Sequence, residues 1–206
     1  MKCIWIDNKI FNVGSLMAIK SAWAQHERLE HFVVDLLNNL INEHDYGRAL
    51  YLLFLYSLLL SLSFDITLVI ISPWITDICY YHVYNPLFEI LDIDKGFSLS
   101  KILNIVAQNG AKVYVITSQF RGERKDMRMS REEFLSKLSQ SVKIIYSKNE
   151  IHQKIYGIRK KFFLTGSLNL TFTGILRGYS GGEFLQLTMS NKNIEVMLEE
   201  LIDIKG

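Results

Sequence analysis

The chain has 206 residues, of which 49% are hydrophobic and 21% charged, and its formal net charge is +2. This length and composition are typical of one globular domain with a full core, and the sequence contains neither repeats nor low-complexity tracts. So small a net charge does not by itself indicate a polyanionic partner. The two cysteines, Cys3 and Cys79, are too few for a disulfide framework and lack metal-ligand spacing.

The first third of the chain is predicted to be helical. Residues 16–43 carry an apolar stripe at helical spacing, and Gly47 is expected to break this helix from the next. The run Ala49–Phe64 is uncharged but shorter than the ~20 residues that span a bilayer, so we expect a buried helix. Membrane association stays open as an alternative. The first residues lack the long apolar region of a signal peptide, which favours a cytoplasmic protein.

Strands and helices alternate in the rest of the chain. The β-branched run Ile66–Ser72 is typical of a strand covered on both faces, and Pro73 ends it. Ser98 or Ser100 caps a helix that runs to Gln108, and Ser130 with Glu133 forms a capping box for a helix to about Leu138. Further strands are expected at Lys112–Thr117, Val142–Tyr146, Ile151–Ile158, Lys161–Leu164 and Phe184–Met189, followed by a helix from Asn191 to Ile202.

This order predicts an α/β fold with a largely parallel or mixed β-sheet flanked by helices. Gly157 suggests a hairpin turn between His152 and Phe162. We expect a single domain over residues 1–206, in which 1–64 form a helical N-terminal extension and 65–206 form the α/β catalytic core.

The residues with the clearest chemistry lie between His152 and Asn169. His152 and Lys154 are two apart in an apolar run, so on a strand they point to the same face. Gly166, Ser167 and Asn169 follow a second apolar run and precede a helix that is expected from Leu168. Free N–H groups and the helix dipole converge at such a position, which suits a phosphate group.

These residues resemble the motif of the phospholipase D superfamily, H-x-K-x4-D-x6-G-S-x-N. His152, Lys154, Gly166, Ser167 and Asn169 match it at the expected spacing, whereas Arg159 stands at the position of the motif Asp. The resemblance implies a phospholipase D-like fold with a helical N-terminal segment.

The resemblance also implies a catalytic set composed of His152, Lys154, Ser167, Asn169 and Glu183. In this family one His attacks phosphorus to form a covalent phosphohistidine, and a second His protonates the leaving oxygen. Lys154, Ser167 and Asn169 would hold the non-bridging oxygens without a metal ion or cofactor. Glu183 fits the place of an acidic residue that fixes the tautomer of the motif His.

Basic residues cluster at two places near the motif. One cluster, in the segment 121–131, comprises Arg121, Arg124, Lys125, Arg128 and Arg131, and the other comprises Arg159, Lys160 and Lys161. Either cluster alone is typical of a solvated loop. Together they favour a nucleic-acid backbone as the substrate, with DNA as the first candidate and RNA as the second. The expected substrate-binding residues are Gly166, Arg159, Lys160, Arg124 and Lys125.

The reaction needs two His-Lys pairs, and this chain contains one, since no other His is followed by Lys two residues later. A homodimer with a composite site is therefore expected. By resemblance, single-motif members are mostly nucleases, so a metal-independent DNA endonuclease is the leading hypothesis. The resemblance also implies an ATPase- or helicase-type partner protein. Two alternatives stay open. One is a lipid phosphodiesterase or phosphatidyl transferase, and the other is a non-catalytic nucleic-acid-binding or assembly subunit with a degenerate motif.

Overall fold

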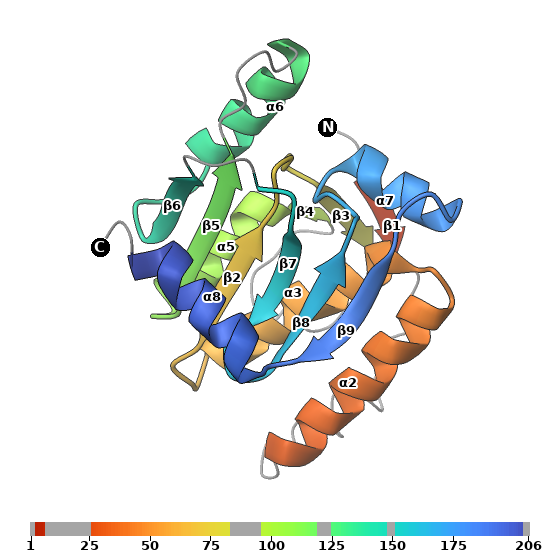
Figure 1. Cartoon of the computed structure of the whole chain (residues 1–206), viewed down its shortest axis with the longest axis vertical. Coiled ribbons are helices and arrows are strands. Elements are labelled where there is room, and N and C mark those ends of the chain that lie inside the picture. Colours follow the sequence, from red (N-terminus) through yellow and green to blue (C-terminus); the bar gives the residue numbers. More distant parts are fainter. Residues whose placement is uncertain (1–2, 7–25, 83–95, 119–124, 148–150, 204–206) are drawn as a thin grey trace.

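A six-stranded mixed sheet forms the centre of the protein (Figure 1). The computed structural model describes residues 3–6, 26–82, 96–118, 125–147 and 151–203. The order in this sheet is β6-β5-β2-β7-β8-β9. The strands are β2 (Thr67–Ile71), β5 (Lys112–Ser118), β6 (Val142–Ser147), β7 (Lys154–Ile158), β8 (Phe162–Gly166) and β9 (Leu185–Met189). The predicted α/β fold with a mixed sheet flanked by helices is confirmed.

A smaller three-stranded sheet, which the sequence did not predict, has the order β1-β3-β4. Its strands are β1 (Cys3–Ile6), β3 (Cys79–His82) and β4 (Gly96–Ser98). The described helices are α2 (His26–Asn42), α3 (Tyr46–Ser61), α5 (Leu99–Gln108), α6 (Lys125–Ser136), α7 (Phe172–Tyr179) and α8 (Lys192–Asp203).

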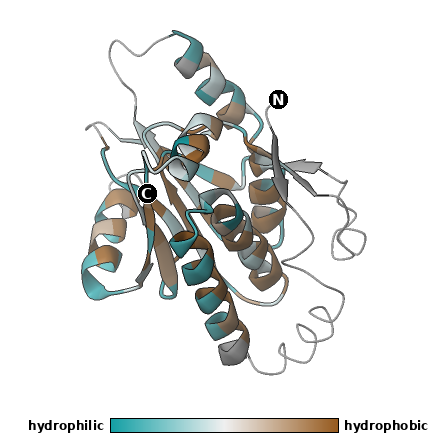
Figure 2. Ribbon diagram, turned by 90° about the vertical axis from the view of Figure 1, so that its right-hand side faces the viewer, coloured by the Kyte–Doolittle hydropathy of each residue, from teal (hydrophilic) through white to brown (hydrophobic). Residues whose placement is uncertain are grey.

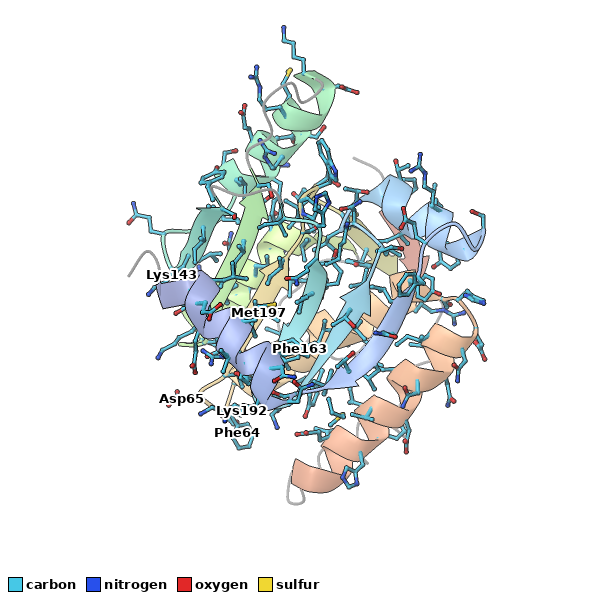
Figure 3. The ribbon with its side chains drawn as sticks, in the orientation of Figure 1. Phe64, Asp65, Lys143, Phe163, Lys192 and Met197 are labelled. Atoms are coloured by element: carbon cyan, nitrogen blue, oxygen red, sulfur yellow. The ribbon has the colours of Figure 1, made fainter. Side chains whose placement is uncertain are left out.

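Successive residues along each strand of the large sheet point to opposite faces and belong to two apolar clusters, one on each face. The larger cluster joins one face to α2, α3 and α5, and apolar residues gather in the central elements of the molecule (Figure 2). The smaller cluster includes Ile71, Phe163 and Leu198, with Met197 of α8 packed against it (Figure 3). Both faces of the sheet are thus covered, which explains the nearly continuous apolar runs of β2 and β5.

Helix α3 is the centre of the larger cluster. Every residue of this helix except Arg48 is buried, which confirms the expected buried helix as far as Ser61, whereas Leu62 and Phe64 at the end of the predicted run are exposed. No helix in the described part of the chain is long and apolar enough to cross a membrane. The break before α3 lies at His44 and Asp45, not at Gly47, because His44 has a positive φ of 56° and the Asp45 carboxylate caps the helix.

Four predicted boundaries are wrong. Strand β7 begins at Lys154, so His152 lies in the segment that precedes the strand. The β7–β8 hairpin exists, but its turn centres on Lys160, whose φ is 63°, and Gly157 lies inside β7. Helix α6 starts at Lys125, which places Ser130 within it, and α7 starts at Phe172, not at Leu168. In each case apolar periodicity marked the element but not its end.

Replacing Leu53 with Ala is expected to lower the free energy of unfolding by about 2–5 kcal/mol, because this side chain is fully buried in α3. Urea denaturation measures the change. Leu62→Ala, at the exposed end of the same helix, is the control and is expected to change stability by about 0.5 kcal/mol or less. Equal losses in the two variants would contradict the central place of α3.

Candidate active site

The two halves of the motif meet at one edge of the large sheet. Strand β7 runs antiparallel to β2 and β8, and Lys154 pairs with Gly166 in the register of β7 and β8. The beginning of β7 therefore lies beside the carboxyl ends of β2 and β8. We call this edge the motif edge. It is the upper edge of the sheet in Figure 1, toward which the arrowheads of β5, β2 and β8 point.

His152 is exposed and lies two residues before β7. The backbone next to it is fixed, because the Ile151 N–H donates to Ser118 Oγ at the end of β5 over 2.9 Å. Lys154 is half-buried, and its Nζ donates to the carbonyl oxygen of His152 over 2.6 Å. This hydrogen bond holds the lysine ammonium against the His152 backbone at the motif edge.

Ser167 is joined to Phe184 by two reciprocal hydrogen bonds. The Ser167 N–H donates to the Phe184 carbonyl oxygen, and the Phe184 N–H donates to Ser167 Oγ, each over 3.1 Å. Gly166 permits this approach, since a Cβ at this position would lie 2.2 Å from the Phe184 oxygen. The end of β8 is thereby held against the beginning of β9.

Asn169 lies in the loop between β8 and α7, and not at a helix start as predicted. Its Oδ1 is buried and makes no hydrogen bond to the described residues. The carbonyl oxygen of Asn169 accepts from the Thr171 N–H over 2.7 Å, and Gly174 packs closely on the same carbonyl. The backbone of this loop is therefore fixed, while one side-chain acceptor has no partner in the described part of the chain.

Glu183 is half-buried and immediately precedes Phe184, the partner of Ser167. Its charge reaches the phenol of Tyr156, two residues beyond Lys154. Burial, followed by the charge of Glu183, raises the pKa of Tyr156 well above its ordinary value, and a hydrogen bond with Ser72 opposes this. Glu183 therefore belongs to the surroundings of the motif edge, and its tautomer-fixing role stays a prediction.

Of the first basic cluster, the structure describes Lys125, Arg128 and Arg131, while Arg121 lies outside the described residues. Arg131 is buried, at 4% exposure, and its guanidinium donates to the carbonyl oxygen of Ser118 over 2.9 Å, so it supports the end of β5. Arg128 pairs with Glu132 on the same helix at 3.8 Å. Lys125 is exposed at the start of α6, and Arg124 lies outside the described residues.

Arg159 and Lys160 lie at the end of β7 that is remote from Lys154, roughly 16 Å away for five extended residues. The Arg159 guanidinium donates to Glu195 over 2.8 Å and to Glu199 over 3.0 Å, both on α8, and the Lys160 N–H donates to Glu195. The structure therefore does not bring Arg159 and Lys160 to the motif edge, and their substrate-binding role stays a prediction. The motif Asp is here replaced by a cation with two carboxylates against it.

Two hydroxyl groups beneath the motif edge were not predicted as site residues. Tyr156 and Ser72 are both fully buried, and their oxygen atoms lie 3.3 Å apart. Ser72 ends the predicted strand Ile66–Ser72, and strand ends are where ligand sites collect in α/β folds, but no sequence signal connects it to Tyr156. Among the described residues, no three His, Cys, Asp or Glu side chains gather in a way that could hold a metal ion.

A protein-family model described as "Cardiolipin synthase, PLD-like domain" matches residues 77–201, which is more than half of the chain. The chain belongs to the phospholipase D-like family. The predicted superfamily is thus confirmed, and membership supports phosphodiesterase-type phosphoryl transfer at the level of the family. The matched segment contains all five motif residues.

No curated protein matches the sequence. Among solved structures, the polyphosphate kinase from Porphyromonas gingivalis is similar, with 17% sequence identity and a TM-score of 0.36. The similarity covers 57% of this chain and 18% of the kinase chain.

Replacing Gly166 with Ala is expected to lower the free energy of unfolding by about 1–3 kcal/mol, because the new Cβ would collide with the Phe184 carbonyl. Chemical denaturation measures the loss. Gly182→Ala is the matched control, since nothing lies within 3.4 Å of a Cβ there, and we expect a change within about 0.5 kcal/mol. Similar stabilities of the two variants would argue against the close packing of Gly166.

Replacing Glu195 with Gln is expected to cost stability at neutral pH and progressively less in acid. Partial burial tends to raise the pKa of Glu195, but hydrogen bonds from Ser190, the Lys160 amide and Arg159 outweigh it and hold the pKa below its ordinary value. A carboxylate with a lowered folded-state pKa stabilises fully above its unfolded pKa of about 4.3. This contribution is lost as the pH falls through the folded-state value.

The measurement is the difference in unfolding free energy between wild type and variant at a series of pH values from 7 downward. Glu200→Gln, an exposed change on the same helix, is the comparator and is expected to cost much less at pH 7. A difference for Glu195→Gln that did not shrink in acid would refute the proposed ion-pair network.

Proposed function

We propose that this protein is a metal-independent phosphodiesterase that cuts a nucleic-acid backbone as a homodimer with a composite active site. DNA is the first candidate substrate and RNA the second. The observation that carries the proposal is the convergence of an exposed His152 with Lys154, Ser167 and Asn169 at one sheet edge, in a chain with a single His-Lys pair. Two copies that face each other across this edge would supply the second pair.

The proposed reaction has two displacements at phosphorus. In the first, a neutral imidazole of His152 forms a phosphorus–nitrogen bond, and the bond from phosphorus to the leaving oxygen breaks. The partner subunit's His152, protonated at this stage, gives its proton to the departing alkoxide. In the second, that imidazole takes a proton from water, the water oxygen attacks phosphorus, and the phosphorus–nitrogen bond breaks. The products are an alcohol and a phosphate monoester, and both imidazoles are regenerated.

The neighbouring side chains suit this role. A phosphodiester gathers negative charge on its non-bridging oxygens during each displacement, and the ammonium of Lys154 next to His152 would stabilise it. Asn169 and Ser167 would contribute amide and hydroxyl donors from the other half of the motif.

The position of Arg159 supports an active site over a degenerate one. The departure from the motif lies at the opposite end of β7, and Glu195 and Glu199 balance its charge. The substitution therefore changes no group at the motif edge.

A lipid substrate is the second candidate. The name of the matched family model includes a cardiolipin synthase. Phe184, which is 52% exposed, lies beside Ser167 and would suit either an acyl chain or a nucleobase. A substrate panel distinguishes these possibilities.

Purified protein is incubated in EDTA with supercoiled plasmid, single-stranded DNA, RNA and phosphatidylglycerol vesicles. We expect cleavage of DNA, and His152→Ala is expected to lower the rate at least about a thousand-fold because the nucleophile is lost. His31→Ala, an exposed histidine on α2, is the matched control and should retain activity. Turnover of vesicles alone would support the lipid candidate, and equal rates for the two variants would reveal a contaminant.

Two further measurements test the mechanism directly. Radiolabelled phosphate trapped on the wild-type chain should be acid-labile and alkali-stable, as expected for phosphohistidine. Sedimentation of the active protein should give about twice 23.9 kDa. An active monomer would contradict the composite site.

A further inference from the structure

The two halves of the motif lie on separate elements, so contacts between those elements fix the distance between them. His152 and Lys154 belong to the start of β7, whereas Ser167 and Asn169 lie in the loop after β8. The strands pair as far as Lys154 and Gly166, and the loop beyond Gly166 leaves the ladder. Beyond the ladder an isolated parallel bridge pairs Leu170 with Ile75, and side-chain contacts complete the connection between Asn169 and the His-Lys pair.

Tyr156 and Ser72 provide this connection. The Tyr156 hydroxyl donates to the carbonyl oxygen of Leu168 over 2.8 Å. Ser72 Oγ accepts from the Leu170 N–H over 3.2 Å and donates to the carbonyl oxygen of Trp74 over 2.6 Å. The residues on both sides of Asn169 are thus bound by side-chain hydroxyls, one from β7 and the other from the end of β2.

Because both hydroxyls are buried, the loop depends on these particular hydrogen bonds. Tyr156 and Ser72 have no measurable exposure, so water cannot replace either hydroxyl as a partner of the loop backbone. The loop has a further tie, since the Thr76 N–H donates to the Leu170 carbonyl oxygen over 3.0 Å. Loss of one hydroxyl should therefore shift the loop without unfolding the protein.

We propose that Tyr156 and Ser72 are positioning residues, which hold Ser167 and Asn169 at the correct distance from His152 and Lys154. Tyr156 is suited to this role because it lies on the same strand as Lys154, two residues away and on the same face. A single side chain thereby ties the strand that begins with Lys154 to the loop that carries the amide. The inference rests on the proposed phosphodiesterase function for its effect on rate.

The test compares Tyr156→Phe with Tyr56→Phe. Both changes remove one buried phenol hydroxyl and keep the ring, but Tyr56 lies on α3, stacks on Phe162, and its hydroxyl has no hydrogen-bond partner among the described residues. Phe162 lies at the far end of β8 from Gly166, so the control is remote from the motif edge. Ser72→Ala removes the second hydroxyl of the connection.

The first readout is amide hydrogen exchange of the segment 167–171, followed in the full-length protein. Tyr156→Phe and Ser72→Ala should raise exchange at Leu170 and its neighbours at least about ten-fold, whereas Tyr56→Phe should leave it unchanged. Unchanged exchange in both site variants would overturn the inference, because the loop would then be held by other contacts.

The second readout is steady-state cleavage. We expect kcat to fall roughly 10- to 100-fold in Tyr156→Phe with little change in KM, because a displaced donor loses its interaction with the transition state more than with the bound substrate. A rise in KM with unchanged kcat, or full activity despite faster exchange, would overturn the positioning role. If the wild-type protein cleaved no substrate, the proposed function would fail, and the exchange rates alone would decide the inference.

Discussion

The antiparallel insertion of β7 between β2 and β8 is the constraint on which the candidate site depends. In a fully parallel sheet the start of β7 would lie at the edge opposite to the ends of its neighbours. Here the reversal brings Lys154 level with Gly166 on β8, and Ser72 follows β2 on the other side of β7. The hairpin that makes this possible is short, with Lys160 in the left-handed conformation at its turn. Chemical groups from separate parts of the chain therefore share one edge, supported by a sheet that is covered on both faces.

The far end of the same hairpin shows how a sequence departs from its family without loss of architecture. Arg159 stands where the motif has an acid, and the charge balance is restored by Glu195 and Glu199 on the last helix. Glu195 also accepts hydrogen bonds from the Lys160 amide and from Ser190, so one carboxylate joins the turn, the end of β9 and α8. The change at the motif Asp position is thus accommodated by local ion pairs, remote from the proposed phosphate chemistry.

Apolar patterning predicted the strands β2, β5 and β6 and the mixed α/β fold, because short β-branched runs between turn residues are typical of buried strands. The spacing of the motif indicated which residues share an edge. Patterning could not identify Tyr156 as a partner of the loop, since a tyrosine in an apolar strand is read as core. It also counted Arg131 among surface charges. Arg131 is in fact buried, because it lies on the same side of α6 as Phe134 and Leu135 and finds an acceptor on β5. The environments of Tyr156 and Arg131 both depend on hydrogen-bond partners that are distant in sequence.

The buried helix α3 has a consequence for how this fold is passed on in evolution. The segment that matches the family begins at residue 77, yet α3 and the central strand β2 precede it. A gene fragment that started at residue 77 would encode β5 and β7 without β2, the strand that lies between them, and it would lack helix α3, which covers one face of the sheet. Recombination or fusion can therefore preserve this architecture only if the crossover falls upstream of Tyr46. The segment that must be inherited together is thus longer than residues 77–201, the segment that matches the family model.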